Sequence, residues 1–206
     1  MFTGIVAAIG NIVSVTPLGQ GDAGVRLTVR AGELALDDVA LGDSIALNGA
    51  CMTVIDKSAN EFNVEVSRES LNCTVGLDGL GEVNLEKALT LADRMGGHLV
   101  SGHVDGLGMV RKFEAVDESY ELLILAPQSL AKYLAFKGSI VVNGVSLTVN
   151  QVRDVADGCE FSINLIPHTI AVTTLKHLSA GAKVNLEVDL IARYVERMLS
   201  VSNVVK

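Results

Sequence analysis

The sequence predicts a protein dominated by β-structure, in which an internal duplication gives two similar small antiparallel barrels and an α-helix ends the chain. Three observations predict this fold. Motifs of the first half return in the same order in the second half, short apolar segments are separated by glycine, asparagine and aspartate, and the last residues change to a helical spacing. Such self-similarity is typical of repeated structural units, here of roughly 90 residues each.

The duplication is visible in four pairs of segments. They are 3–6 with 101–104, 44–54 with 139–149, 61–62 with 160–161, and 83–86 with 184–187. The second pair is identical at six of eleven positions, and the fourth pair is identical throughout. The stretch from Gly96 to Asp105 is therefore the junction between two copies of one unit.

The composition limits the classes of partner. The chain has 206 residues, of which 49% are hydrophobic, enough to build two small cores. A net charge of −8 argues against binding to nucleic acid or to an anionic membrane surface. Three cysteines without a pairing pattern, no basic signal sequence and no apolar run of about 20 residues predict a soluble, cytoplasmic protein. A small, weakly charged ligand fits these properties.

Each copy is expected to contribute six strands, because its segments alternate apolar and polar residues or are apolar over four to eight residues. In the first copy these are Phe2–Val15, Gly24–Arg30, Ser44–Ala50, Cys51–Lys57, Glu61–Ser67 and Glu82–Glu86. In the second they are Gly102–Lys112, Tyr120–Ala126, Ser139–Val145, Ser146–Val152, Glu160–Ile166 and Ala182–Glu187. Asn48-Gly49 and Asn143-Gly144 lie between apolar runs and predict type I′ turns, in which both central residues have positive φ.

Short helical segments are expected at corresponding places in the two copies. They are Ala31–Val39 and Gln128–Phe136 before the hairpins, and single turns at Ser70–Thr74 and Thr169–Thr173. A further helix is predicted over Glu86–Met95, where Gly96-Gly97 would end it.

The last segment has the apolar spacing of an amphipathic helix. Its apolar residues are Leu190, Ile191, Tyr194, Val195, Met198 and Leu199, with Arg193, Glu196 and Arg197 opposite. This stripe could pack on its own barrel or on a partner. We favour self-association into a closed, symmetric oligomer.

Several residues could carry chemistry, and each has a structural alternative. Cys51 could be a nucleophile or a small buried hydrophobe, and it corresponds to Ser146 in the second copy. His103 corresponds to the apolar Ile5, whereas His98 is expected to be a core histidine satisfied by a hydrogen bond. The spacing of the two histidines gives no metal site. Asp105 and Asp189 are read as solvated charges, and phosphate loops and dinucleotide motifs are absent.

Five motifs in order make the chain resemble the riboflavin synthase family of the alpha-chain, lumazine-binding-repeat type. They are Met1–Val6, Leu47–Val54, Gly96–Asp105, Asn143–Val149 and Leu165–Thr169. The resemblance implies two six-stranded Greek-key barrels, 1–97 and 98–188, and a helix at 189–206 that joins three chains into a homotrimer. Ala50 and His168 depart from residues common in the family at the pocket rim.

The resemblance also implies a reaction. Two molecules of 6,7-dimethyl-8-ribityllumazine exchange a four-carbon unit and give riboflavin and 5-amino-6-ribitylamino-uracil, without a metal or other cofactor. The site would form between the amino-terminal barrel of one chain and the carboxy-terminal barrel of its neighbour. Association with lumazine synthase, the donor and acceptor pockets and the order of proton transfers stay open.

The residues implied as functional fall into three sets. Those tied to activity are Phe2, Ser44, Cys51, His103 and Asp189. A first pocket would use Gly4, Ile5, Val6, Cys51, Met52, Thr53, Glu65, Val66, Ser67, Arg68, Glu69 and Ser70. A second would use Gly102, His103, Val104, Lys137, Ser146, Leu147, Thr148, Asn164, Leu165, Ile166, Pro167, His168 and Thr169.

Two other functions compete with this reading. A lumazine or flavin carrier that catalyses nothing would share the fold. The motifs of both pockets are present in this sequence, and their presence favours an enzyme. A flavin-reductase-like barrel would need a nicotinamide-binding domain, for which two repeats leave no room.

Overall fold

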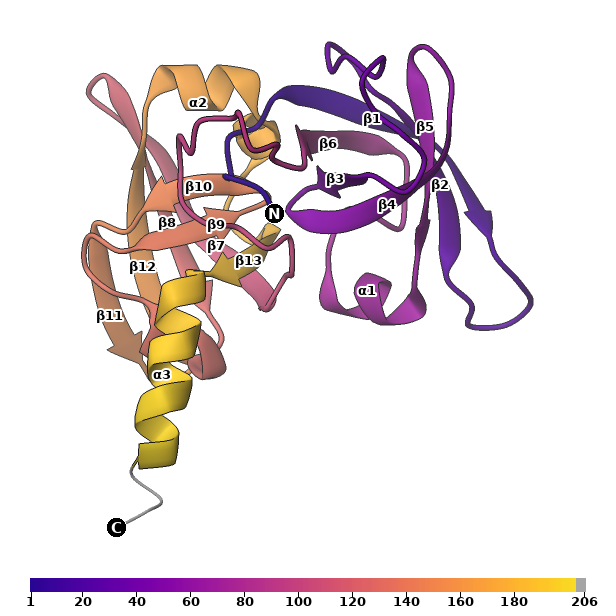
Figure 1. Cartoon of the computed structure of the whole chain (residues 1–206). Helices are drawn as coiled ribbons and strands as arrows, with labels where there is room; N and C mark the ends of the chain where they lie inside the picture. Colours follow the sequence, from indigo (N-terminus) through magenta and orange to yellow (C-terminus); the bar gives the residue numbers. More distant parts are fainter. Residues whose placement is uncertain (203–206) are drawn as a thin grey trace.

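The structure is a computed structural model that describes residues 1–202, and it contains two β-barrels side by side (Figure 1). The long helix α3 extends away from the second barrel at the end of the chain. The fold is the one expected from the duplication. Among the described residues, no helix has both the length and the apolar character needed to cross a membrane.

The first barrel is closed by six antiparallel strands in the order β1-β2-β5-β4-β3-β6. Alternate residues of each strand point inward, as in β2, where Val25, Leu27 and Val29 are buried and the residues between them are more exposed. The strands are β1 (Ala8–Pro17), β2 (Val25–Arg30), β3 (Ser44–Leu47), β4 (Ala50–Lys57), β5 (Glu61–Val66) and β6 (Gly81–Lys87), and the short helix α1 (Arg68–Cys73) follows β5.

The second barrel repeats this topology with one strand divided in two. Its sheet order is β10-β9-β13-β7-β8-β12-β11, so the two ends of the sheet are consecutive in sequence. Its elements are β7 (Gly106–Val116), β8 (Ser119–Ala126), η1 (Gln128–Tyr133), β9 (Ser139–Val142), β10 (Val145–Thr148), β11 (Gln151–Val155), β12 (Gly158–Leu165), α2 (Pro167–Val172), η2 (Thr174–His177) and β13 (Lys183–Val188). The division falls at Val149 and Asn150, whose N–H groups donate to Gly138 and Ser162 on opposite sides. The strand expected over Ser146–Val152 is therefore present as β10 and β11.

The predicted helix over Glu86–Met95 is wrong. Glu86 and Lys87 belong to β6 and pair with Ala46 and Ile45 of β3, so sheet pairing overrides their helical propensity. The following residues form turns instead, one of them held by Asp93, whose Oδ2 accepts from the backbone N–H of Thr90 at 2.8 Å. The Ala31–Val39 segment is likewise made of turns, not a helix.

Both predicted asparagine-glycine turns are confirmed. Asn48 and Gly49 have φ of 46° and 85°, and Asn143 and Gly144 have φ of 47° and 82°. The two turns meet back to back, because a methyl group placed on either glycine would lie 2.8 Å from the backbone nitrogen of the other. The repeated hairpins are therefore in direct backbone contact between the two barrels.

Two buried asparagines join the barrels beside these turns. Asn84 Nδ2 of the first barrel donates to the carbonyl of Asn143 at 2.8 Å, and Asn185 Nδ2 of the second donates to the carbonyl of Asn48 at 3.0 Å. Each asparagine comes from the repeated Val-Asn-Leu-Glu segment. The duplication thus gives reciprocal contacts that fix how the barrels sit.

Acid is expected to weaken one contact at the edge of this interface. Glu82 of β6 accepts from His177 Nε2 at 2.8 Å and from Lys176 Nζ at 3.1 Å, both on η2, and these partners hold the pKa of its carboxyl below the usual range. A lowered pKa stabilises the folded state above about pH 4.3, and that stabilisation is lost as the pH falls through the lowered value. We expect Glu82→Gln to reduce the free energy of unfolding at pH 7 by under about 1 kcal/mol, since the pair is partly exposed. Urea titrations at several pH values measure the free energy of unfolding of both proteins. A difference between the variant and the wild type that persisted at the lowest pH would contradict this expectation.

Helix α3 (Leu190–Ser202) is attached to its own barrel by its polar side. Asp189 Oδ1 accepts from the N–H of Ile191 at 2.8 Å and so caps the helix, and Arg193 pairs with Asp105 through two nitrogens at 2.7 Å each. Glu196 accepts from Lys132 of η1 at 2.6 Å. Most of the apolar stripe is exposed: Ile191 and Tyr194 are uncovered, and Val195 and Leu199 border a groove against η1.

Candidate functional site

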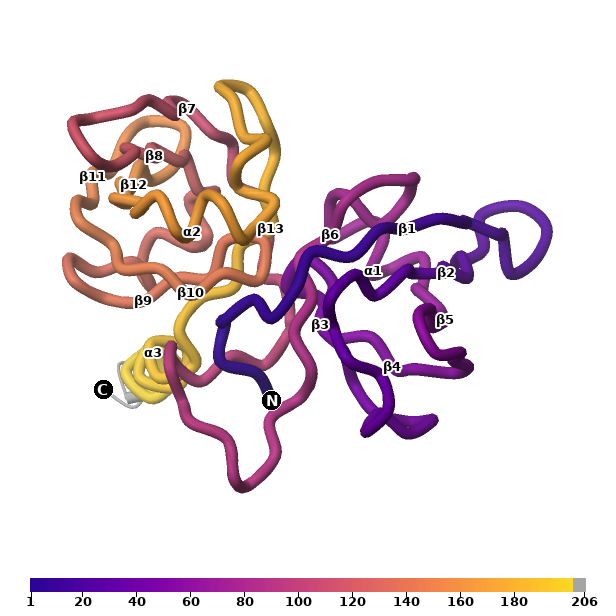
Figure 2. The backbone as a smooth tube through the Cα atoms, turned by 90° about the horizontal axis from the view of Figure 1, so that it is seen from above, coloured from indigo at the N-terminus to yellow at the C-terminus, as the bar shows by residue number. Residues whose placement is uncertain are grey.

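The site is built around two glycine turns that lie side by side between the barrels. Phe2 and Val100 exchange two backbone hydrogen bonds, of 2.8 and 3.1 Å, so the amino terminus pairs with the junction between the repeats. The view from above shows the amino-terminal segment running between the two barrels (Figure 2). Gly4 and Gly102 follow this pairing with φ of +75° and +81°, a conformation that favours glycine.

Each turn lies on the barrel of the other repeat. The carbonyl of Gly4 accepts from Ser146 N–H at 2.7 Å, and the carbonyl of Gly102 accepts from Cys51 N–H at 2.8 Å. Packing agrees, because Val6 packs on the core of the second barrel and Val104 on the core of the first. The grouping expected from the sequence is therefore wrong in one respect: residues 4–6 belong with Ser146 and residues 102–104 belong with Cys51.

The first cluster gathers Phe2, Cys51 and Gly102. Phe2 is fully buried, and a methyl group on Gly102 would lie 2.7 Å from Cys51 Cβ and 2.8 Å from the Phe2 ring. Cys51 is half-buried on β4, where alternation sends Met52 into the core and leaves Thr53 exposed. His103 directly follows the residue that bonds Cys51, so the turn that carries His103 lies against Cys51.

The second cluster gathers Ser146, His98 and Asp189. His98 Nδ1 lies 2.7 Å from Ser146 Oγ, which bears out the expected hydrogen bond of this histidine. Its Nε2 is buried and has no hydrogen-bond partner among the described residues. Burial lowers the pKa of His98, and the negative charge of Asp189 opposes that shift. A neutral imidazole in this place can exchange a proton with the Ser146 hydroxyl.

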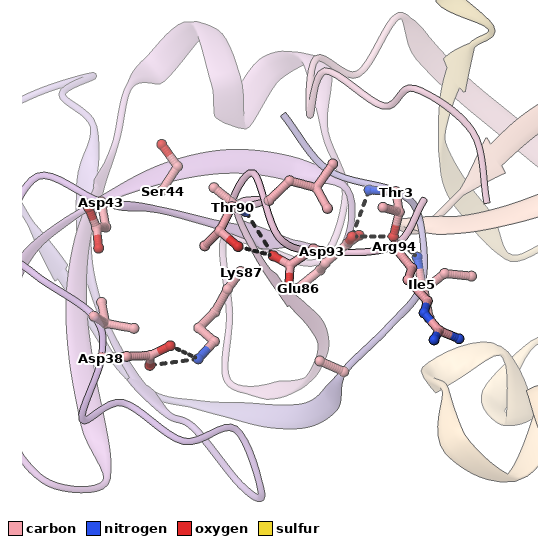
Figure 3. A pocket seen from close by; sticks show the side chains of 14 residues that line it. Thr3, Ile5, Asp38, Asp43, Ser44, Glu86, Lys87, Thr90, Asp93 and Arg94 are labelled. Atoms are coloured by element: carbon pink, nitrogen blue, oxygen red, sulfur yellow. Dashed lines mark hydrogen bonds and ion pairs between the residues drawn. The ribbon is translucent and has the colours of Figure 1, made fainter. Parts of the chain in front are cut away.

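Ser44 opens into a cleft of about 620 Å³ on the first barrel (Figure 3). Thr3 and Ile5 line it from the amino-terminal segment, and Thr90 and Arg94 line it from the loop after β6. Ile5 is half exposed, so an apolar ring could reach this side of its turn. The cleft therefore leads from the surface to the Gly4 turn, whose neighbours Thr3 and Ile5 line it.

The remaining expected residues lie at corresponding strand ends or on the core side. Val66, Leu165 and the side chain of Leu147 contribute to the cores. Ser67 caps α1 through Ser70 N–H at 3.0 Å, and Ile166 and Pro167 begin α2. Glu65, Glu69, Thr148, Asn164 and His168 are exposed, and Arg68 and Thr169 are half-buried in the first turns of α1 and α2.

Lys137 is set apart from the two clusters. Its Nζ donates to Asn150 Oδ1 at 3.0 Å, and its backbone N–H donates to Val149. These contacts place it where β10 and β11 separate. No contact in the described residues joins it to either glycine turn.

Sequence reasoning missed two buried carboxylates behind the turns. Glu86 accepts from the backbone N–H groups of Thr3 and Gly4, and Glu187 accepts from those of Ser101, Gly102 and His103. The signal was present, since both end the identical Val-Asn-Leu-Glu segments. The sequence could not show which residues these carboxylates bind, because the bonds join residues more than 80 positions apart.

The comparisons with known proteins agree with this architecture. The lumazine binding domain model matches residues 3–88 and again 101–189. The riboflavin synthase of Photobacterium phosphoreum is 44% identical over 203 residues, which cover 98% of this chain and 90% of the relative. The chain belongs to the riboflavin synthase family. The member from Bacillus subtilis is 41% identical over 206 residues, covering 98% of this chain and 92% of that one.

Solved structures outside the riboflavin synthases share the fold. A crystal structure of LumP complexed with riboflavin superimposes with a TM-score of 0.77 at 24% identity, covering 91% of this chain and 99% of that one. A LumP complex with 6,7-dimethyl-8-(1′-D-ribityl) lumazine gives a TM-score of 0.76 at the same identity. At this identity the likeness shows the fold alone, whereas the riboflavin synthase family members are far closer in sequence.

Proposed function

We propose that the protein is a riboflavin synthase, which converts two molecules of 6,7-dimethyl-8-ribityllumazine into riboflavin and 5-amino-6-ribitylamino-uracil. The observation that carries this is the pair of reciprocal turn clusters, because a reaction between two identical substrates needs two similar pockets. Family membership at more than 40% identity over the whole chain supports the same activity.

The two pockets differ in ways that suit unequal roles. The Cys51 cluster combines a thiol with the turn that carries His103, and the Ser146 cluster combines a hydroxyl with a neutral imidazole at His98. A base removes a proton from the acidic 7-methyl group of one lumazine, and the resulting carbanion attacks the second molecule. Orienting two reactants can supply roughly 7–11 kcal/mol of a barrier reduction, so holding the two lumazines face to face is a main part of the proposed catalysis.

The proposal includes assembly. Each chain carries its two turn clusters between its own barrels, and three chains joined through α3 would set the amino-terminal barrel of one against the carboxy-terminal barrel of the next. The exposed apolar stripe of α3 supports this homotrimer. The three free cysteines support a cytoplasmic location.

The deciding experiment is incubation of the purified protein with the lumazine alone. Riboflavin formed at half the amount of lumazine consumed, with no added cofactor, would establish the dismutation. Tight binding with unchanged lumazine would instead make the protein a carrier, which is the alternative function. Absorbance spectra distinguish the two results directly.

We expect Cys51→Ala to lower turnover by roughly tenfold to 100-fold. A positioned proton-transfer group typically contributes about 100-fold or more, so this loss is at or below the lower end of that range. The thiol lies beside the Gly102 turn, so its loss leaves the fold intact but removes a reactive group from the pocket. Steady-state kinetics measure the effect, with Cys73→Ala as a control at an exposed cysteine of α1. Full turnover by Cys51→Ala would remove the thiol from the mechanism.

A further inference from the structure

Two buried carboxylates hold the glycine turns by similar sets of hydrogen bonds. Glu86 Oε1 accepts from Thr3 N–H at 2.7 Å and from Thr3 Oγ at 2.6 Å, and its Oε2 accepts from Gly4 N–H at 2.9 Å. Glu187 Oε1 accepts from Ser101 N–H at 2.6 Å and from Ser101 Oγ at 2.7 Å. The two side chains belong to residues that are only 9% and 2% exposed, so these bonds replace their contact with water.

Glu187 makes two further bonds, one of them to the backbone of His103. Its Oε2 accepts from both Gly102 N–H and His103 N–H at 3.0 Å. The backbone of the imidazole-bearing residue is therefore fixed by a carboxylate on β13. Burial raises the pKa of both glutamates, and the hydrogen bonds from the turns oppose that shift.

The connection crosses from one barrel to the other. Glu187 stands on β13 of the second barrel, but the turn it holds bonds Cys51 of the first. Glu86 stands on β6 of the first barrel, but the turn it holds bonds Ser146 of the second. Each pocket is thus completed by a turn whose position depends on the other barrel.

We infer that Glu86 and Glu187 are positioning residues with crossed targets: Glu187 sets the Cys51 pocket through Gly102 and His103, and Glu86 sets the Ser146 pocket through Thr3 and Gly4. The assignment of the pockets to ligands rests on the proposed function, but the crossed geometry does not. A glutamine at either position replaces one acceptor oxygen by a donor that would face the N–H groups of the turn. The turn then loses its anchor while the barrel keeps its shape and volume.

The test measures the alkylation rate of one cysteine thiol in each pocket. All proteins carry Cys73→Ser, which removes the exposed cysteine, and Cys159 is fully buried. In one background Cys51 is the reporter, and in the other Cys51→Ser is combined with Ser146→Cys. Glu86→Gln and Glu187→Gln are introduced into both, with Glu61→Gln of the barrel surface as the matched control.

We expect Glu187→Gln to change the ligand-free alkylation rate of the Cys51 thiol by about tenfold, the equivalent of one lost hydrogen bond to a charged group, and to leave the other reporter unchanged. Glu86→Gln should show the reverse. A change confined to the thiol of the same barrel, an equal change at both thiols or no change at either would overturn the inference. If either glutamine variant fails to fold, Ser101→Ala and Thr3→Val remove one donor each and should give the same crossed pattern at smaller size.

Riboflavin is then added to the same proteins as a separate measurement. In the parent backgrounds it should protect both thiols, and in Glu187→Gln protection of Cys51 should need about tenfold more riboflavin. Absence of protection in the parents would count against the proposed function while leaving the ligand-free rates to decide the crossed positioning. Equal protection in the parents and in both variants would contradict the positioning role.

Discussion

Replacing Gly49 with alanine is expected to destabilise the protein by about 2–5 kcal/mol. The residue has φ of +85°, and an L-residue in this left-handed conformation costs roughly 1–2 kcal/mol. The added methyl would also lie 2.8 Å from the backbone nitrogen of Gly144 and 3.2 Å from its Cα. Because both atoms belong to a turn that is itself buried against Asn84 and Asn185, they cannot move aside, and overpacking adds about 1–3 kcal/mol.

The matched control is Gly42→Ala. Gly42 has a similar φ of +94°, but nothing lies within 4 Å of an added methyl. This variant should therefore show the backbone strain alone, about 1–2 kcal/mol. Urea unfolding followed by circular dichroism measures both. Equal losses in the two variants would mean that the contact between the hairpins does not hold the barrels together.

Local sequence signals predicted the repeated elements well. Asn48-Gly49 and Asn143-Gly144 specify their own turn type, because few residues adopt positive φ at two successive positions. The alternation in β2 is visible from neighbouring residues alone, and the paired Val-Asn-Leu-Glu segments are visible by comparing the two halves of the sequence. The same applies to α3, where one spacing identifies both the helix and its apolar side.

The failures share a different cause. Glu86 and Lys87 were expected to start a helix, but they pair with Ala46 and Ile45 of β3, which lie far earlier in the chain. Gly4 bonds the second barrel and Gly102 bonds the first. These contacts depend on how the two domains dock, which no local sequence pattern encodes. The roles of Glu86 and Glu187 follow from that docking, so the sequence could show that they repeat but not what they hold.

Leu199→Glu on α3 is expected to convert the proposed trimer into single chains and to reduce turnover by more than about 1,000-fold. The helix contacts its barrel through Arg193 and Glu196, and Leu199 is 61% exposed at the edge of the apolar stripe, one turn after Glu196. A carboxylate there costs little in a single chain, because it stays in water. It is costly in an assembly that buries the stripe, since an unpaired charge would have to leave water.

The loss of turnover would follow from the separation of pockets. If the two lumazines meet between chains, a single chain keeps both pockets but can no longer hold the reacting molecules face to face, and the advantage of oriented encounter disappears. Leu80→Glu, at a 72%-exposed leucine before β6, makes the same chemical change away from α3 and should leave mass and turnover unaltered. Sedimentation and riboflavin formation are measured on the same samples. A Leu199→Glu protein that sediments as a single chain yet keeps full activity would place the reaction within one chain, between the Cys51 and Ser146 clusters.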